Sequence, residues 1–348
     1  MNHYTKLYID GYEEVVHCHN KELGFCAWIA IHNTNRGPAL GGCRIWSYPT
    51  SKEALADALR LSKAMTYKNA LARLPLGGGK TVVNTQLEKA DRERLFLEIG
   101  NFVETLDGRY IIAEDVNSTV EDMTVVMRRT EHVATVGASG NPSPSTAYGV
   151  YCAMKASALH KFGSSNLSGR KVAIQGLGQT GGRLAQLLFQ DSCQITGCDI
   201  NPENIRTLQE KTTLQPVSPE EIYAIPCDIF APCALGGVIN SDTIPLLQCQ
   251  IIAGSANNQL SREEDGSLLQ QASILYAPDF VCNSGGVINI SCEIDQKYNS
   301  KKAKQRINTI YDTLLEIYAL SESQGKPTNL VANELAENLF ASPQPALS

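Results

Sequence analysis

The 348-residue chain lacks several features that mark membrane, secreted and nucleic-acid-binding proteins. It has no run of about 18 apolar residues, so no transmembrane helix is expected. Its N-terminal segment contains Asp10, Glu13 and Glu14 and no apolar stretch, which argues against a secretory signal. The net charge of −6 provides no basic surface, so neither nucleic acid nor an anionic membrane is an expected partner.

Closely spaced cysteine pairs are also lacking. The chain has 11 cysteines, an odd number, and none of them form a Cys-x-x-Cys arrangement. We therefore expect reduced thiols in a cytoplasmic protein. The triplet His17-Cys18-His19 could suggest a metal ion. Two valines precede it, so an edge strand is the preferred interpretation, and no metal site is predicted.

The length and the 43% hydrophobic content predict two domains with substantial cores. In the first half, predicted strands at residues 25–32 and 110–113 alternate with two predicted helices. The apolar positions of these helices are Leu55, Ala58, Leu59 and Met65 after a Thr50-x-x-Glu53 capping box, then Leu95, Ile99, Phe102, Val103 and Leu106. The second strand ends in Glu114-Asp115, where α/β proteins place chemistry, although a turn cap would have the same sequence.

Two lysines flank a triple-glycine turn: Lys68 lies within residues 65–70, and Lys80 follows Gly77-Gly78-Gly79. Consecutive glycines let the backbone pass close to a ligand. A lysine held there beside a second cation can lose its proton near neutral pH and act as a base. A flexible turn with a solvated lysine is the alternative interpretation. A Walker loop is set aside, because Leu74 occupies the position where that motif requires glycine.

Small residues and prolines at residues 137–145 predict a domain boundary. We expect a first domain over residues 1–136 and a second over residues 137–327. A C-terminal helix at about residues 328–348 is expected to pack back on the first domain. The helix that begins near Thr146 would open the second domain.

The second domain begins with a strong dinucleotide-binding signal. A predicted strand at residues 171–175 leads into Gly176-Leu177-Gly178-Gln179-Thr180-Gly181 and a helix, and the next strand, residues 194–198, ends at Asp199. The turn and the helix N-terminus would bind the pyrophosphate, and Asp199 would accept hydrogen bonds from the ribose hydroxyls. No cation follows Asp199 before Arg206, which favours NAD over NADP.

Further short apolar strands at residues 227–230, 251–253 and 274–276 predict a parallel sheet. The loops after them carry Ala234 and Asn257 and would lie on the nucleotide side.

Eight segments then carry a resemblance that covers nearly the whole chain. They are residues 37–42, 65–70, 76–80, 113–116, 140–144, 231–236, 256–260 and 285–289. In this order and spacing they resemble the Glu/Leu/Phe/Val dehydrogenases, most closely the leucine dehydrogenases. The resemblance implies a two-domain α/β fold, with an N-terminal substrate domain, a Rossmann domain and the active site in the cleft between them. It also implies reversible NAD-dependent oxidative deamination of an L-amino acid to a 2-oxo acid and ammonia.

The resemblance further implies a role for individual residues. Lys68 would bind the substrate carboxylate, helped by the backbone N–H groups of Gly41 and Gly42. Lys80 would be the general base that activates water, and Asp115 would hold the amine and shuttle a proton. Thr146 would orient the nicotinamide, Asn257 would lie near the reacting centre, and Ala234 would contact the cofactor.

By family position, the pocket for the substrate side chain would include Leu40, Met65, Ala113, Val287 and Ile290, all of which are apolar. Leu40 and Ile290 stand where glutamate-specific members carry a lysine and a serine, so a second carboxylate would lack a partner. Leucine or another branched-chain amino acid is the expected substrate. The alternatives are an aromatic amino acid, phenylalanine or tryptophan, and a non-catalytic NAD-binding or amino-acid sensor.

Two departures from the family pattern concern assembly. The segment before residues 140–142 is shorter than in the better-known leucine enzymes, and the sequence ends soon after Leu339-Phe340. A homo-oligomer is still expected, but as a dimer or higher and not necessarily an octamer.

Overall fold

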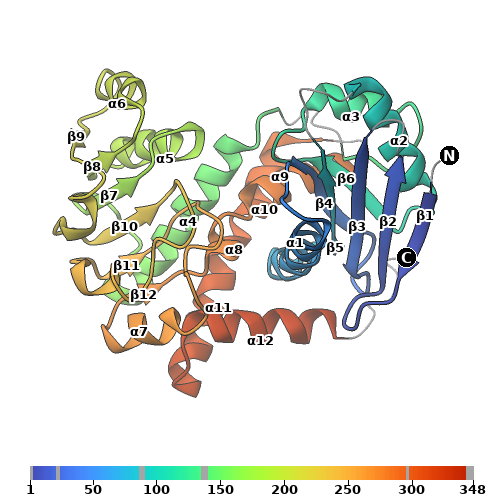
Figure 1. Cartoon of the computed structure of the whole chain (residues 1–348). Coiled ribbons are helices and arrows are strands. Elements are labelled where there is room, and N and C mark those ends of the chain that lie inside the picture. The colour runs from blue at the N-terminus through green and yellow to red at the C-terminus, as the bar shows by residue number, and fades with distance from the viewer. Residues whose placement is uncertain (1–2, 21–23, 86–90, 135–139, 295–297, 342–348) are drawn as a thin grey trace. The chain divides into compact units, whose positions relative to one another are not determined.

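The computed structural model describes the chain except for residues 1–2, 21–23, 86–90, 135–139, 295–297 and 342–348 (Figure 1). Contacts divide it into two compact units. Unit 1 falls within Met1–Ala138, Glu293–Lys297 and Ala336–Ser348, and unit 2 within Ser139–Cys292 and Tyr298–Leu335. The predicted domain limit at residue 136, part of the break at residues 137–145 and the end of the expected C-terminal helix lie outside the described residues. No helix among the described residues is both long and apolar enough to cross a membrane.

Unit 1 is built on a six-stranded mixed sheet in the order β1-β2-β3-β5-β4-β6. Its strands are β1 His3–Leu7, β2 Glu14–Asn20, β3 Phe25–Asn33, β4 Ala39–Trp46, β5 Gly77–Asn84 and β6 Tyr110–Glu114. Neighbours from β1 to β5 run antiparallel, whereas β4 is parallel to both β5 and β6.

The expectation that His17-Cys18-His19 lies on an edge strand is wrong. β2 lies between β1 and β3, and His3 of β1 pairs with His19. The edge strand on this side of the sheet is β1, whose sequence His-Tyr-Thr-Lys-Leu contains no apolar run that would predict a strand.

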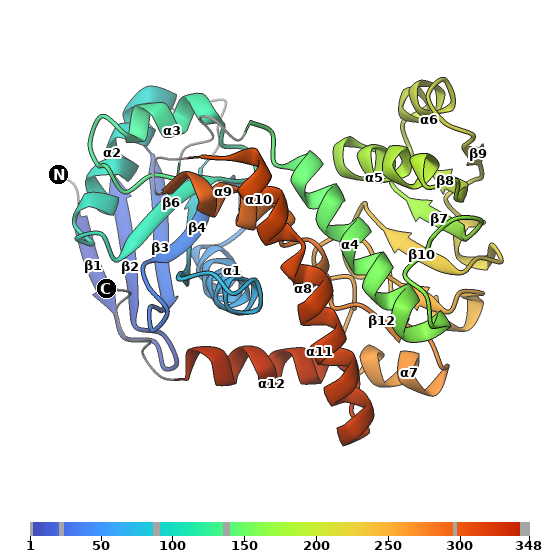
Figure 2. The same ribbon diagram turned by 180° about the vertical axis from the view of Figure 1, so that it is seen from behind.

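Both faces of this sheet are covered by helices: α1 Ser51–Leu71 lies on one face, while α2 Arg92–Glu104 and α3 Val120–Val126 cover the other (Figures 1 and 2). The capping box that opens α1 is present, because the Thr50 hydroxyl accepts a hydrogen bond from the Glu53 N–H. The expected apolar face of α1 is only partly correct. Leu55, Leu59 and Met65 are half-buried, whereas the fully buried line consists of Ala54, Ala58, Ser62 and Thr66. These small side chains let α1 lie close to the sheet.

Unit 2 is built on a six-stranded sheet in the order β12-β11-β10-β7-β8-β9, and every neighbouring pair is parallel. Its strands are β7 Lys171–Gln175, β8 Gln194–Cys198, β9 Gln215–Pro216, β10 Ile229–Pro232, β11 Ile251–Ile252 and β12 Leu275–Tyr276. The prediction of an α/β chain with a parallel, Rossmann-type sheet is confirmed. The strand expected at residues 227–230 begins two residues later, as β10.

The helices of unit 2 are α4 Ser143–Phe162, α5 Gln179–Gln190, α6 Pro202–Gln209, α7 Asp265–Gln271, α8 Asp279–Cys282, α9 Gly285–Ile294, α10 Ser300–Ile307 and α11 Thr309–Gln324. Helices α5, α6 and α7 connect strands of the sheet, whereas α4 precedes β7 and the others follow β12. Helix α4 packs against both α5 and α11 (Figure 2). The last helix, α12 Thr328–Phe340, contributes its final turn to unit 1. There the Tyr67 hydroxyl donates a hydrogen bond of 2.6 Å to Glu337.

The glycines that open β5 allow backbone contacts that no other residue would permit. A Cβ atom on Gly78 would lie 2.0 Å from the backbone nitrogen of Thr66 in α1, and a Cβ atom on Gly41 would lie 1.7 Å from the carbonyl oxygen of Gly79. The Asn69 amide also donates a 2.6 Å hydrogen bond to the Gly77 carbonyl. Helix α1 and strands β4 and β5 are thus in direct main-chain contact around residues 77–79.

We expect Gly78→Ala to destabilise the protein by about 3 kcal/mol, because its Cβ would overlap main-chain atoms that cannot rotate away. Gly178→Ala is the matched control, since its Cβ would meet no atom within 4 Å and its φ of −66° suits alanine. Urea unfolding without dinucleotide measures both variants. Equal midpoints would contradict this account of the packing around β5.

Candidate active site

Lys80 and Asp115 form an ion pair in unit 1. The Lys80 Nζ atom lies 2.8 Å from Asp115 Oδ2. Lys80 projects from the middle of β5 and is only 5% exposed, whereas Asp115 follows the end of β6 and keeps 25% of its side chain exposed. The two residues predicted to be catalytic are therefore adjacent, with access from the Asp115 side.

Gly42 leaves the space beside this pair open. In the parallel pairing of β4 with β5, Leu40 lies opposite Gly78 and Cys43 lies opposite Thr81. The same register places Gly42 beside Lys80. A Cβ atom on Gly42 would lie 2.6 Å from Asp115 Cβ and 3.3 Å from Lys80 Nζ. Any larger residue at this position would displace the pair.

Strand alternation places further predicted residues on the same face of the sheet. Leu40 is two positions from Gly42 on β4, and Ala113 pairs directly with Gly42 across β4 and β6. Leu40 is 2% exposed and Ala113 is 7% exposed. Two side chains on the same face as the Lys80–Asp115 pair are thus apolar and buried.

Helix α1 carries Met65 and Lys68 to this face. Thr66, which lies between them in the sequence, is in main-chain contact with Gly78, two residues before Lys80. Met65 and Lys68 are three positions apart, so they share one side of the helix, and both are half-buried. The predicted carboxylate-binding lysine is therefore on the helix that packs over the base of the predicted site.

Two groups missed by the sequence analysis hold Asp115 in place. Arg44 Nε donates a 3.1 Å hydrogen bond to Asp115 Oδ2, the same oxygen that contacts Lys80. The Asp115 N–H donates to the Ser118 hydroxyl, which in turn donates to the Cys43 carbonyl. The available signal for Arg44 was its position two residues after Gly42, on the same face of a strand.

The charge of Asp115 is stabilised by its neighbours. Burial opposes ionisation, but the charges of Lys80 and Arg44 and the hydrogen bonds that they donate outweigh it, and the pKa of Asp115 is lowered. Asp115 is therefore a carboxylate at neutral pH, able to accept a hydrogen bond from an ammonium group.

In unit 2 the glycine turn has the geometry that a dinucleotide requires. Gly176 has a φ of +94° and packs against Ala234, and a Cβ atom on Gly181 would lie 1.9 Å from the Gly176 carbonyl oxygen. Gly178, by contrast, has open space where a Cβ atom would stand. The first and third glycines therefore close the strand–helix turn, while the second leaves its backbone free to approach a pyrophosphate at the N-terminus of α5.

Asp199 is fixed against this turn. Its Oδ2 atom accepts a 2.7 Å hydrogen bond from the Leu177 N–H, and its Oδ1 atom accepts a 2.8 Å hydrogen bond from the Asn201 N–H. Each carboxylate oxygen can accept more than one hydrogen bond, so both can still bind ribose hydroxyls.

The remaining predicted residues also lie in unit 2. Thr146 is in the first turn of α4, and a Cβ atom on Gly286 of α9 would lie 2.7 Å from its hydroxyl oxygen. Asn257 follows β11 and accepts a 2.8 Å hydrogen bond from the Asn283 amide. On α9, Val287 and Ile290 share a half-buried side of the helix. The predicted residues thus form two groups, one within each unit.

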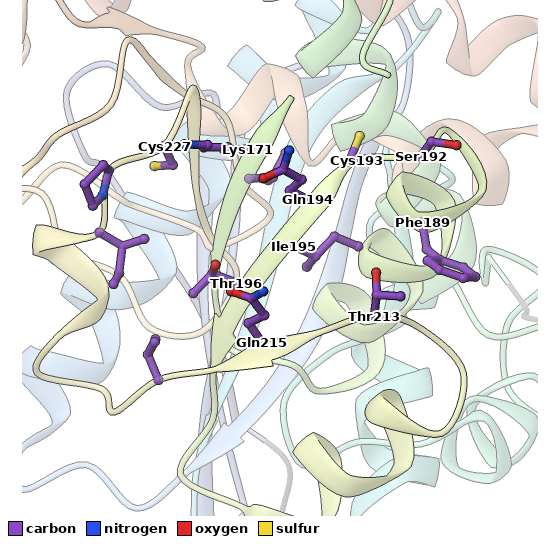
Figure 3. A pocket seen from close by; sticks show the side chains of 14 residues that line it. Lys171, Phe189, Ser192, Cys193, Gln194, Ile195, Thr196, Thr213, Gln215 and Cys227 are labelled. Atoms are coloured by element: carbon purple, nitrogen blue, oxygen red, sulfur yellow. The ribbon is translucent and has the colours of Figure 1, made fainter. Parts of the chain in front are cut away.

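A cavity of about 790 Å³ in unit 2 lies away from these residues (Figure 3). Lys171 and Gln194, which line it, are the first residues of β7 and β8, whereas Gly176 and Asp199 follow the last residues of these strands. The cavity is therefore at the amino ends of the parallel strands, while nucleotides bind at their carboxyl ends. Despite its volume, this cavity is therefore not the expected dinucleotide site.

Comparison with known proteins identifies the family. The model of the Glu/Leu/Phe/Val dehydrogenase dimerisation domain matches residues 13–132, and the model of the glutamate/leucine/phenylalanine/valine dehydrogenase domain matches residues 199–338. These matches make the protein an amino acid dehydrogenase, an oxidoreductase that acts on CH–NH2 groups and uses a pyridine nucleotide. The chain belongs to the Glu/Leu/Phe/Val dehydrogenase family.

Its relatives act on different amino acids. The chain is 46% identical to a leucine dehydrogenase of Geobacillus stearothermophilus, over 97% of this chain and 93% of that protein. It is 38% identical to a phenylalanine dehydrogenase of Caldalkalibacillus thermarum, over 94% and 91% of the two chains. The crystal structure of the L-tryptophan dehydrogenase of Nostoc punctiforme matches with a TM-score of 0.86 and 42% identity, over 95% and 96% of the two chains.

Proposed function

We propose that this protein catalyses the reversible, NAD-dependent oxidative deamination of leucine and related branched-chain amino acids to 2-oxo acids and ammonia. The observation that carries the proposal is the Lys80–Asp115 ion pair beside Gly42, on the same sheet face as the buried apolar residues Leu40 and Ala113. The 46% identity to a leucine dehydrogenase supports the same choice. In this proposal, unit 1 binds the amino acid and unit 2 binds the dinucleotide.

Each polar group near the pair has a task suited to its chemistry. Lys68 binds the substrate carboxylate together with the N–H groups of Gly41 and Gly42. Asp115 accepts a hydrogen bond from the substrate amine, which its ionised state permits, and passes on a proton. Lys80, once neutral, takes a proton from the water that attacks the imine carbon.

A bound dinucleotide would supply the acceptor for the hydride that leaves the substrate Cα. The backbone around Gly178 and the N-terminus of α5 would hold its pyrophosphate, Thr146 would orient its carboxamide, and Ala234 and Asn257 would flank it. Asp199 would bind the adenosine ribose. Its carboxylate has no arginine partner among the described residues, so the 2′-phosphate of NADP would meet an uncompensated negative charge.

The apolar side chains decide the substrate class. Leu40, Met65 and Ala113 in unit 1, with Val287 and Ile290 in unit 2, offer no partner to a distal carboxylate, whose desolvation would cost several kcal/mol. An aromatic substrate is the second candidate, because the tryptophan dehydrogenase of Nostoc punctiforme is similar over nearly the whole chain. The family description of residues 13–132 as a dimerisation domain supports a homo-oligomer.

A substrate panel tests the proposal directly. We expect kcat/KM with NAD to be highest for leucine, isoleucine or valine, lower for phenylalanine and tryptophan, and near zero for glutamate. NADH absorbance at alkaline pH measures each rate. Faster turnover of an aromatic amino acid would select the second candidate, and binding without any turnover would contradict the catalytic assignment.

Substitution of Lys80 and of Lys68 should change different kinetic constants. We expect Lys80→Ala to lower kcat by roughly 10²–10⁴-fold with little change in NAD affinity, because it removes the base. Lys68→Ala should mainly raise the KM for the amino acid, because it removes the carboxylate anchor. Steady-state kinetics separate kcat from KM, and the quenching of protein fluorescence by added NAD measures the affinity for NAD. Normal kinetics in both variants would show that the roles are misassigned.

Cofactor choice should depend on Asp199. We expect Asp199→Ala to reduce the preference for NAD over NADP by about tenfold or more, equivalent to about 1.4 kcal/mol. Asp199→Asn is the matched variant, since it removes the charge and keeps an oxygen for the Leu177 N–H. The ratio of kcat/KM for the two cofactors is the measurement, and an unchanged ratio in both variants would exclude Asp199 as the discriminating residue.

A further inference from the structure

A chain of charged and polar side chains leads away from the Lys80–Asp115 pair on the sheet face that α1 covers. Arg44 Nε donates to Asp115 Oδ2, and Arg44 Nη1 lies 3.1 Å from Asp57 Oδ2 on α1. Asp57 is held in turn by the Tyr48 hydroxyl at 2.6 Å and by Arg60 at 2.7 Å. Arg44 is therefore fixed at both ends of its guanidinium group.

This arrangement controls one oxygen of Asp115 and leaves the other available. Lys80 and Arg44 both contact Oδ2, and Oδ1 has no hydrogen-bond partner among the described residues. The Ser118 contact fixes the backbone of Asp115 as well. The carboxylate is therefore held in one orientation, with Oδ1 directed to whatever binds beside it.

The second cation matters because the first must lose its charge. When Lys80 is neutral, a largely buried Asp115 with no other partner would tend to take up a proton. Arginine stays protonated throughout the working pH range, so Arg44 keeps a positive charge on Asp115 in every state of Lys80. In a lone Lys–Asp pair, a proton lost by the lysine could instead pass to the carboxylate, and the neutral Asp115 could then no longer accept a hydrogen bond from the substrate ammonium group at both oxygens.

We propose that Arg44 is a positioning residue for the reaction, which holds Asp115 by Oδ2 and remains its counter-ion when Lys80 is deprotonated. This inference rests on the proposed function. Arg44 itself touches neither substrate nor cofactor, and acts through Asp115.

Other ionisable groups near the pair do not compete for this role. Cys43 and Tyr110 are within electrostatic reach of Asp115, but burial raises the pKa of both, so they stay neutral. Burial raises the pKa of Glu114, which is next to Asp115 in the chain, and the charge of Glu121 on α3 raises it further. Asp57 faces Arg44 with a lowered pKa: burial opposes its ionisation, but hydrogen bonds from Tyr48 and Arg60 and the charge of Arg44 outweigh it.

The test compares Arg44→Gln, Arg44→Lys and Arg60→Gln. Loss of the positive charge in Arg44→Gln stabilises the protonated forms of the pair. We expect the acid limb of its kcat/KM profile to move to higher pH, and kcat to fall by about ten- to a hundredfold. Arg44→Lys keeps the charge but cannot reach both carboxylates, so its kcat should fall while its acid limb stays in place. Arg60→Gln, exposed and one residue further along the chain of contacts, should match the wild type.

A second readout does not require turnover. Carboxyl-carbon NMR, assigned with Asp115→Asn, should show the pKa of Asp115 raised in Arg44→Gln and little changed in Arg44→Lys. An unshifted Asp115 titration and an unshifted acid limb, with only a lower unfolding midpoint, would reduce Arg44 to a structural residue. If Arg44→Gln does not fold, wild-type kcat in Arg44→Lys would overturn the proposal. Absence of amino acid turnover by the wild-type protein would instead contradict the proposed function, and the NMR titration would still decide the role of Arg44.

Discussion

The candidate site in unit 1 depends on main-chain contacts made possible by glycine at the start of β5. Gly78 lies against the backbone of Thr66 in α1, and Gly41 of β4 lies against the carbonyl of Gly79. These contacts bring a helix and two strands closer together than side chains would allow. Lys80 follows directly, so its ammonium group reaches Asp115 from a backbone that cannot easily shift. A flexible glycine turn, the alternative interpretation of the sequence, does not describe residues 77–79, which lie inside a strand.

Electrostatics adds a second constraint. A base and a carboxylate in contact stabilise each other's charges, which favours the ion pair over the neutral base that the reaction needs. The Arg44 guanidinium offers a resolution, because it shares Asp115 Oδ2 with Lys80 and is itself held by Asp57. The glycines around β5 and the permanent charge of Arg44 therefore both help to hold Asp115 in place as a carboxylate.

Local sequence signals predicted much of the fold. The capping box before α1, the apolar stripe of α2 and the strand–glycine–helix–strand order from β7 to Asp199 each concern residues close in sequence, and each is present. The edge strand was misplaced and the buried side of α1 was only partly predicted. β1 forms the edge because it pairs with β2. The buried line on α1 consists of Ala54, Ala58, Ser62 and Thr66, because these are the residues that face the sheet. Neither partner can be read from the segment itself.

The sequence by itself determined the family, the α/β class and the residue types available for chemistry. It also provided the glycines at 77–79 and 176–181, whose roles depend on backbone angles and on the absence of a side chain. Only the tertiary structure decided which charges meet. Arg44, Asp57, Lys80 and Asp115 come from two strands, a helix and a strand end. Their contacts exist because sheet register and helix packing place distant residues within 3.1 Å or less, and a Coulomb interaction at that distance depends on geometry that no local pattern encodes.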